Sequence, residues 1–146
     1  MCLYVRVSVI IHSMDDINLA SATTKTPKFT FKGQTMRAKC VSVYDGDTAQ
    51  FAMMISGELR RMSCRMIGYN CAEMVTHDCI EKAKAEVAAS ALRDLILNKI
   101  VTLIFDDFDK YGRPLVVVHV DGIDVNKYMI DNHIGVVYDG HGDKLW

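Results

Sequence analysis

Three short segments of this chain carry the residue types that handle phosphodiesters. Asp45 and Asp47 flank Gly46, Arg65 is followed eight residues later by Glu73, and Arg113 ends the segment Asp109-Lys110-Tyr111-Gly112-Arg113. Carboxylates supply the hard oxygen ligands that a divalent cation needs, and guanidinium groups spread the charge of a phosphoryl group. The sequence therefore contains the groups needed to bind and cleave a phosphodiester.

Each of these residues also has an ordinary structural interpretation. An Asp-Gly-Asp between two strands is often a hairpin turn, but alternation would put Asp45 and Asp47 on one side, with Asp47 on a metal and Asp45 supporting it. Arg65 lies in a mostly apolar strand and needs an anion there, either a protein carboxylate or a ligand phosphate. Arg113 could equally be a solvated loop residue. Glu73 could equally be an ordinary surface charge.

The elements that must position these residues are mainly strands. Apolar alternation and β-branched runs, separated by Gly and Asp turns, predict strands and a final apolar piece. Their ranges are Ala38–Tyr44, Thr48–Ile55, Leu59–Ile67, Ile100–Phe105, Leu115–Val120 and Ile134–Tyr138. Five strands with a helix between the third and fourth indicate an α+β protein built on a closed OB-type barrel.

The helix is predicted over Asp78–Leu97, where apolar residues recur at helical spacing. We expect one buried stripe, formed by Ile80, Ala83, Val87, Ala88, Ala91, Leu92 and Leu95. Asp78 is placed to cap the helix, and Glu81 to return a bond to the capping residue. A short second helix is expected over Val125–Ile130.

Length and composition indicate one domain. The 146 residues are half apolar, which suits a single core, and we divide them into an extension or linker over residues 1–28 and a domain over residues 29–146. The region from Ser13 to Pro27 is polar without a clear period, as in a linker. With 17 basic and 18 acidic residues the formal charge is −1, so nucleic acid must be captured locally.

The five cysteines and the apolar start bear on compartment. An odd number with irregular spacing favours reduced intracellular thiols, and a zinc site from Cys64, Cys71, His77 and Cys79 is a minor alternative because its gaps do not match zinc motifs. Leu3–Ile11 resembles a short signal segment, but Arg6 interrupts it. The segment is also too short to span a bilayer. We expect an intracellular monomer, cytoplasmic or nuclear, with secretion as the alternative.

The order and gaps of the motifs are more specific than any one of them. They are Asp45-Gly46-Asp47-Thr48, Arg65 with Glu73, a helix, Asp109-Lys110-Tyr111-Gly112-Arg113, and Asp121-Gly122 followed by Val125-Asn126. In this series the chain resembles the staphylococcal nuclease (thermonuclease-like) family over about Ala38 to Tyr138.

The resemblance implies a calcium-dependent endonuclease that hydrolyses DNA and RNA on an OB-type barrel. It implies Glu73 as the base for the attacking water, Arg65 and Arg113 as clamps on the phosphate, and Asp47 as a Ca²⁺ ligand supported by Asp45. Asn70 and the Cys71 backbone carbonyl match the family's metal contacts, and Lys110 and Tyr111 match its nucleotide contacts. Tyr138 is a further candidate substrate contact because its ring could stack on a base.

Two positions depart from the family pattern. Asn70 stands where the family has an aspartate ligand, and Ala72 replaces the proline before Glu73. Losing one formal charge beside a divalent cation costs roughly 2 to 4 kcal/mol at an effective dielectric near 20. These changes support an alternative function, a catalytically weakened module that binds nucleic acid or protein.

Overall fold

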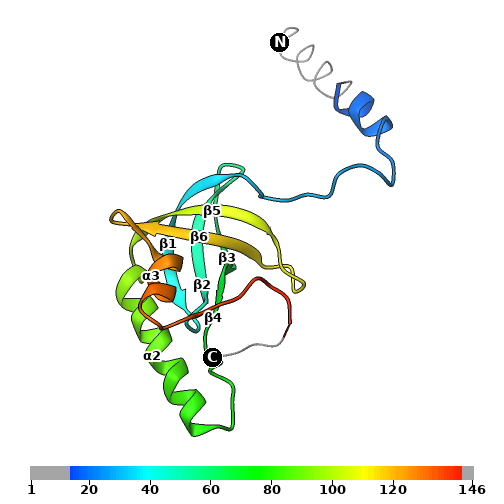
Figure 1. The fold of residues 1–146 in the computed structure, drawn as a ribbon. Helices are drawn as coiled ribbons and strands as arrows, with labels where there is room; N and C mark the ends of the chain where they lie inside the picture. The colour runs from blue at the N-terminus through cyan, green and yellow to red at the C-terminus, as the bar shows by residue number, and fades with distance from the viewer. Residues whose placement is uncertain (1–13, 143–146) are drawn as a thin grey trace.

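The computed structural model describes residues 14–142 (Figure 1). Its centre is a closed barrel of five strands. They are β1 (Thr35–Val43), β2 (Thr48–Ile55), β3 (Glu58–Met66), β5 (Ile100–Phe108) and β6 (Pro114–Val120). Neighbours in the order β3-β2-β1-β5-β6 are antiparallel, and a parallel pairing of Arg65 with Leu115 closes the ring between β3 and β6. The predicted OB-type barrel with helices is confirmed.

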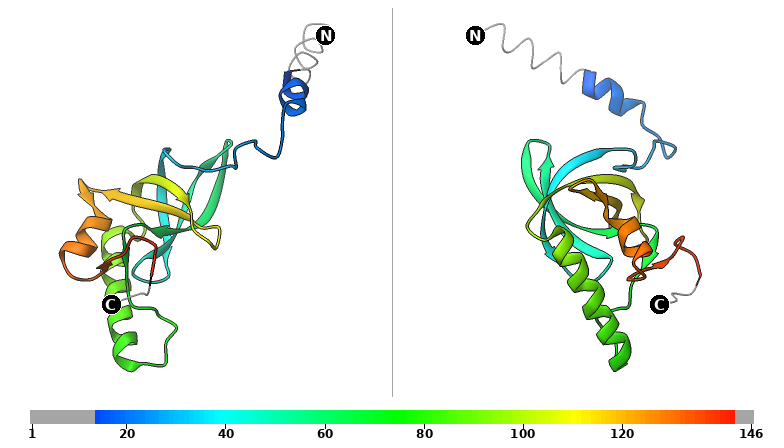
Figure 2. Two further views of the ribbon diagram at one scale, coloured as in Figure 1. Left: turned by 45° about the vertical axis from the view of Figure 1, so that its right-hand side comes forward. Right: turned by 60° about the vertical axis from the view of Figure 1, so that its left-hand side comes forward.

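Five further elements accompany the barrel strands. They are β4 (Tyr69–Asn70), α2 (Cys79–Ile96), β7 (Ile123–Asp124), α3 (Val125–Asp131) and β8 (Val136–Val137). Figure 2 shows α2 and α3 at the same end of the barrel in both views. β4 pairs with β8, so the segment after β3 is fixed to the chain that follows α3. This pairing was not predicted, because each strand has only two residues.

The core lies inside the barrel and under the two helices. Inward-facing strand residues alternate with more exposed ones, as in β6, where every second residue is buried. The largest fully buried side chains are those of Tyr69, Phe51, Met53, Met66, Leu92, Ile96, Leu103 and Met129. Because β3, β4 and α2 all contribute to this core, the loops that join them are fixed at both ends.

Helix α2 begins at the predicted cap. The Asp78 carboxylate accepts hydrogen bonds from the backbone N–H groups of Ile80 at 2.7 Å and Glu81 at 3.0 Å. These two bonds lower the pKa of Asp78. The Glu81 carboxylate does not return a bond to the cap as predicted, since it accepts one from the Thr76 hydroxyl.

The buried face of α2 differs from the predicted stripe. The residues that face the core are Ala85, Ala88, Ala89, Leu92 and Ile96. Ile80 and Val87, which we placed in the buried stripe, are 71% and 64% exposed. The apolar pattern of this helix is wider than the face that the barrel covers, so periodicity alone selected the wrong side for the first half of the helix.

Several boundaries also differ from the predicted ones. Strand β1 begins at Thr35 rather than Ala38, and β5 continues to Phe108 through an irregular register after Phe105. Residues 14–20, predicted to be linker, are helical, and residues 14–29 are exposed. The segment Leu3–Ile11 lies outside the described residues. Within residues 14–142, no helix is long and apolar enough to cross a bilayer.

The side chain of Asn126 in α3 joins the helix to the barrel. Its Oδ1 accepts from the backbone N–H of Val118 at 3.0 Å, and its Nδ2 donates to the carbonyls of Ile67 at 2.9 Å and Val116 at 3.0 Å. The residue is 5% exposed. One amide therefore satisfies three backbone groups at the point where β3 ends beside β6.

We predict that Asn126→Ala lowers the free energy of unfolding by about 2 to 4 kcal/mol, because buried backbone groups lose their partners. Asn132→Ala is the matched control, since that exposed amide makes one bond, to the Tyr128 carbonyl. Its cost should stay below about 1 kcal/mol. Chemical denaturation of the three proteins measures both values, and equal losses would contradict the role given to Asn126.

Candidate functional site

The Asp-Gly-Asp turn between β1 and β2 is pressed against the helix end of the molecule. A Cβ on Gly46 would lie 2.6 Å from the Ala88 Cβ and 2.6 Å from the Cys71 Sγ. The Tyr69 hydroxyl donates to the Gly46 carbonyl at 2.8 Å. Glycine is required at this position because the backbone passes so close to α2 and Cys71, and this contact fixes the two flanking carboxylates.

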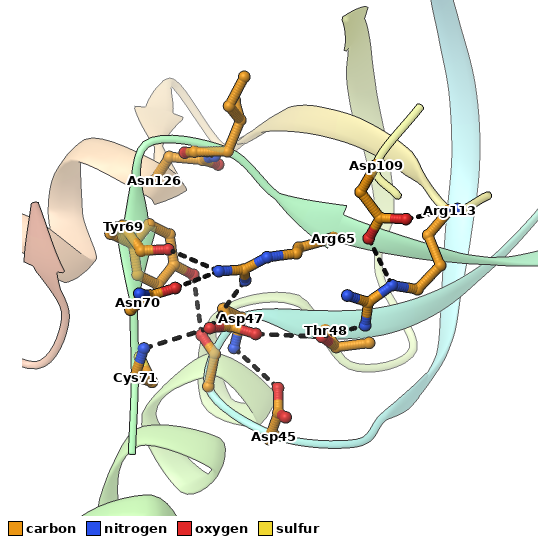
Figure 3. Close-up of polar contacts among 12 residues, drawn as sticks. Asp45, Asp47, Thr48, Arg65, Tyr69, Asn70, Cys71, Asp109, Arg113 and Asn126 are labelled. Atoms are coloured by element: carbon orange, nitrogen blue, oxygen red, sulfur yellow. Dashed lines mark hydrogen bonds and ion pairs between the residues drawn. The ribbon is translucent and has the colours of Figure 1, made fainter. Parts of the chain in front are cut away.

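Asp47 is the central acceptor of the site (Figure 3). Its Oδ1 accepts from the Thr48 hydroxyl at 3.0 Å, and its Oδ2 accepts from the Cys71 backbone N–H at 3.2 Å. The same Oδ2 lies 2.8 Å from the Arg65 Nη1. Asp47 is 9% exposed, so nearly all of its hydrogen-bonding capacity is directed to protein groups.

Arg65 directs its guanidinium toward Asp47, Asn70 and Tyr69 (Figure 3). Its Nη2 donates to the Asn70 Oδ1 and, at 3.4 Å, to the Tyr69 carbonyl. Its Nη1 forms a charge pair with Asp47 without the alignment of a hydrogen bond. The side chain is 12% exposed. Of the two anions considered for Arg65, the one in contact is a protein carboxylate.

Arg113 is held from the other side by its own loop. Its Nε donates to the Asp109 Oδ2 at 2.7 Å, and its backbone N–H to the Asp109 Oδ1 at 2.9 Å. Although partial burial opposes ionisation, these bonds and the N–H of Tyr111 lower the pKa of Asp109. The Arg113 Nη1 reaches the Thr48 hydroxyl at 3.5 Å, and the side chain is 30% exposed. Arg113 is thus oriented toward Asp47 while remaining accessible.

The predicted catalytic residues converge on one cavity of about 390 Å³. Its lining includes both arginines, Glu73 and the two turn carboxylates. The full lining is Tyr44, Asp45, Asp47, Thr48, Arg65, Glu73, Met74, Val75, Tyr111 and Arg113. Segments separated by up to about half of the chain therefore meet around one cavity, as joint action on one phosphodiester would require.

A second cavity of about 290 Å³ contains the predicted nucleotide contacts. Lys110, Tyr111 and Tyr138 line it together with Arg65 and Arg113, which also line the first cavity. The Tyr111 ring lies below both neighbouring cations, 5.1 Å from the Lys110 Nζ and 5.5 Å from the Arg113 Cζ. The structure thus brings all three predicted contact residues beside the arginine pair.

The predicted metal ligands are only partly gathered. Burial and the nearby Asp47 carboxylate raise the pKa of Asp45 to about 6. A hard divalent cation would relieve the repulsion between these two carboxylates. Asn70 lies behind Arg65, is 1% exposed and directs its Oδ1 to that guanidinium. Within residues 14–142, no group of three His, Cys, Asp or Glu is arranged to hold a metal. Carboxylate and amide oxygens are the donor type that Ca²⁺ binds, but the Asn70 amide contributes no negative charge.

The thiols do not form a zinc site in the described part of the chain. Cys64 and Cys71 are buried, whereas Cys79 is exposed at the start of α2. Burial raises the pKa of the Cys64 and Cys71 thiols to about 12, and thiolates are the form that zinc binds. Cys71 contacts Asp47 through its backbone N–H, a contact that differs from the carbonyl we predicted as a ligand.

Three residues of the site were not assigned roles from sequence. Thr48 connects Asp47 to Arg113, Tyr69 ties the turn to β4, and Asp109 orients Arg113. Asp109 stands four residues before Arg113 in a turn, where an aspartate that accepts local N–H groups is common, so it was detectable. The bond from Tyr69 spans 23 residues and has no local signal.

Two comparisons with known proteins give matches to this chain. An uncharacterized protein of Bacillus anthracis is 27% identical over 107 residues, which cover 71% of this chain and 48% of the relative, so the chain spans about half the relative's length. The family model described as staphylococcal nuclease homologue matches residues 63–144, a segment that contains Arg65, Glu73 and Arg113 and begins after Asp47. Because this match covers more than half of the 146 residues, the chain belongs to the staphylococcal nuclease homologue family.

Proposed function

We propose that this protein is a Ca²⁺-dependent endonuclease that hydrolyses phosphodiester bonds in DNA or RNA. The observation that carries the proposal is the convergence of Asp45, Asp47, Arg65, Glu73 and Arg113 on one open cavity. Membership of the nuclease family supports the same reaction class. Two guanidinium groups and a carboxylate around one space match the needs of attack by water on a phosphate.

The protein groups divide the work by charge. Glu73 is the general base that takes a proton from the attacking water. Arg113, accessible and already oriented by Asp109, binds a phosphate oxygen with its terminal nitrogens. Arg65 stabilises the charge that develops on the phosphoryl oxygens, and for this it must share its guanidinium between the phosphate and Asp47.

Asp47 and Asp45 are the residues that would hold the metal, with Asn70 and the Cys71 carbonyl as further ligands in our proposal. A bound Ca²⁺ would supply positive charge close to the phosphate oxygens. Burial and, to a smaller extent, the neighbouring Asp47 carboxylate raise the pKa of Asp45, and a cation at this position would relieve the repulsion between the two carboxylates. Asn70 lowers the number of formal charges available to the ion.

A module that binds nucleic acid or protein without cleaving is the second candidate. The orientation of Arg65 favours it, because this side chain already contacts Asp47 and Asn70. A phosphate that binds only Arg113, Lys110 and Tyr111 would be captured without being activated. The two candidate functions differ in one requirement: the nuclease needs Glu73 and a divalent cation for cleavage, whereas the binding module needs neither for binding.

We predict that plasmid DNA is degraded in millimolar Ca²⁺ and is intact when a chelator is present. Glu73→Gln should lower the rate by about 10² to 10⁴-fold, the usual contribution of a positioned general base. Gel electrophoresis of a time course measures the loss.

Glu86→Gln on the exposed face of α2 is the matched control and should leave the rate unchanged. Absence of any cleavage by the wild-type protein across a Ca²⁺ series would reject the nuclease and leave the binding module.

We also predict that Asn70→Asp tightens Ca²⁺ binding by about ten- to a hundredfold, because a carboxylate is added beside Asp47 while Arg65 offsets part of its charge. Isothermal titration calorimetry with CaCl₂ measures this without any requirement for activity. Asn132→Asp, on the exposed end of α3, adds the same charge away from the site. Equal Ca²⁺ affinities for the wild-type protein and Asn70→Asp would remove residue 70 from the metal site.

A further inference from the structure

The outward face of strands β1 to β3 has an uneven distribution of charge. Its positions are those that alternate with buried residues in each strand. They are Thr35, Arg37 and Lys39 on β1, Gln50, Ala52 and Met54 on β2, and Leu59, Arg61 and Ser63 on β3. Three of these nine are cations and none is a carboxylate, although the whole chain carries a formal charge of −1.

Strand register brings two of the cations onto one line. Lys39 pairs with Ala52, and Ala52 pairs with Arg61. Two strand spacings of about 4.8 Å put Lys39 and Arg61 about 10 Å apart across a small side chain. Among the described residues no carboxylate forms an ion pair with either cation, and Glu58 is bound to Arg60. Arg37 donates to the Thr102 hydroxyl at 2.8 Å and keeps its charge.

This face is continuous with the candidate active site along β3. The outward positions of the strand run from Arg61 through Ser63 to Arg65, which lines both cavities of the site. At about 3.4 Å per residue, Arg61 and Arg65 are about 14 Å apart along the strand. An OB-type barrel commonly contacts about 4 to 16 nucleotides, so this distance is within the reach of one bound strand.

We propose that the outer face of β1 to β3 is a binding track for single-stranded nucleic acid, through its phosphates, on one side of the bond to be cleaved. The direction of this track rests on the proposed function. A bound nucleic-acid strand would run from Lys39 and Arg61 toward Arg65 in the candidate active site. Met54 and Leu59, 60% and 66% exposed, lie on the same face as apolar contacts for bases. No aromatic side chain is among the nine outward positions, so binding is electrostatic, weakly sequence-dependent and sensitive to salt.

The test is fluorescence anisotropy with a labelled 20-nucleotide DNA strand in chelator, which prevents metal-dependent cleavage. The double variant Lys39→Gln/Arg61→Gln should bind several-fold more weakly than the wild-type protein. The slope of log K against log salt concentration should fall by about 1.4, or 0.7 for each lost phosphate contact. The control is Lys82→Gln/Lys84→Gln on the exposed side of α2, which removes the same charge and should leave the slope unchanged.

Equal slopes for the two double variants would overturn the track. Equal binding of a 20-base-pair duplex would overturn the assignment to single strands, and binding to phosphatidylserine vesicles without binding to the oligonucleotide would assign the face to a membrane surface. Cleavage separates this proposal from the previous one. A wild-type protein that cleaves while the Lys39/Arg61 variant binds normally refutes only the track, and a protein that binds through these residues without cleaving refutes only the nuclease.

Discussion

The Asp47 carboxylate is the group on which the arrangement of the site depends. It contacts β3 through Arg65, the segment after β4 through the Cys71 N–H, and its own strand through Thr48. A carboxylate so little exposed is stable only when its charge is compensated, and removing one partner of a buried ion pair typically costs about 3 to 5 kcal/mol. The contacts that fix the geometry therefore also occupy the oxygen atoms that a metal would need.

Because the Asp47 oxygens are already in contact with protein groups, the charge of the side chain at residue 70 affects the balance of the whole cluster. With an amide at this position, the Arg65 guanidinium and the buried Asp47 carboxylate balance each other, while burial and the Asp47 carboxylate together raise the pKa of Asp45. The cluster is then electrostatically satisfied by the protein's own groups. A carboxylate at residue 70 would leave an excess of negative charge, which favours cation binding and would draw Arg65 away from Asp47. In the proposed nuclease, the identity of residue 70 would therefore set how strongly the site binds a metal ion.

Local patterns predicted the elements well where one physical signal dominated. Alternation located the barrel strands, and the Asp78 cap located the start of α2. The motif order grouped Arg65, Glu73 and Arg113, and the structure places these three residues around one cavity, while their catalytic roles stay predictions. Local patterns failed where contacts distant in sequence decide: the apolar pattern of α2 could not say that Ile80 and Val87 face outward, because that depends on the width of the barrel end. They also left two anions open for Arg65, since Asp47 is brought near only by the pairing of Thr48 with Arg65.

Strand β3 connects the two functional inferences. Its inward side chains enter the core, its outward row carries Arg61 and Arg65, and its end is held by Tyr69 and Asn70. A protein with almost no net charge cannot attract a polyanion from a distance, so binding must come from cations placed close together on a rigid surface. A closed sheet meets this need because register fixes the spacing of its outward side chains. The same strand that holds Arg65 in place beside Asp47 therefore also sets the distance from Arg65 to Arg61, the next cation along the face.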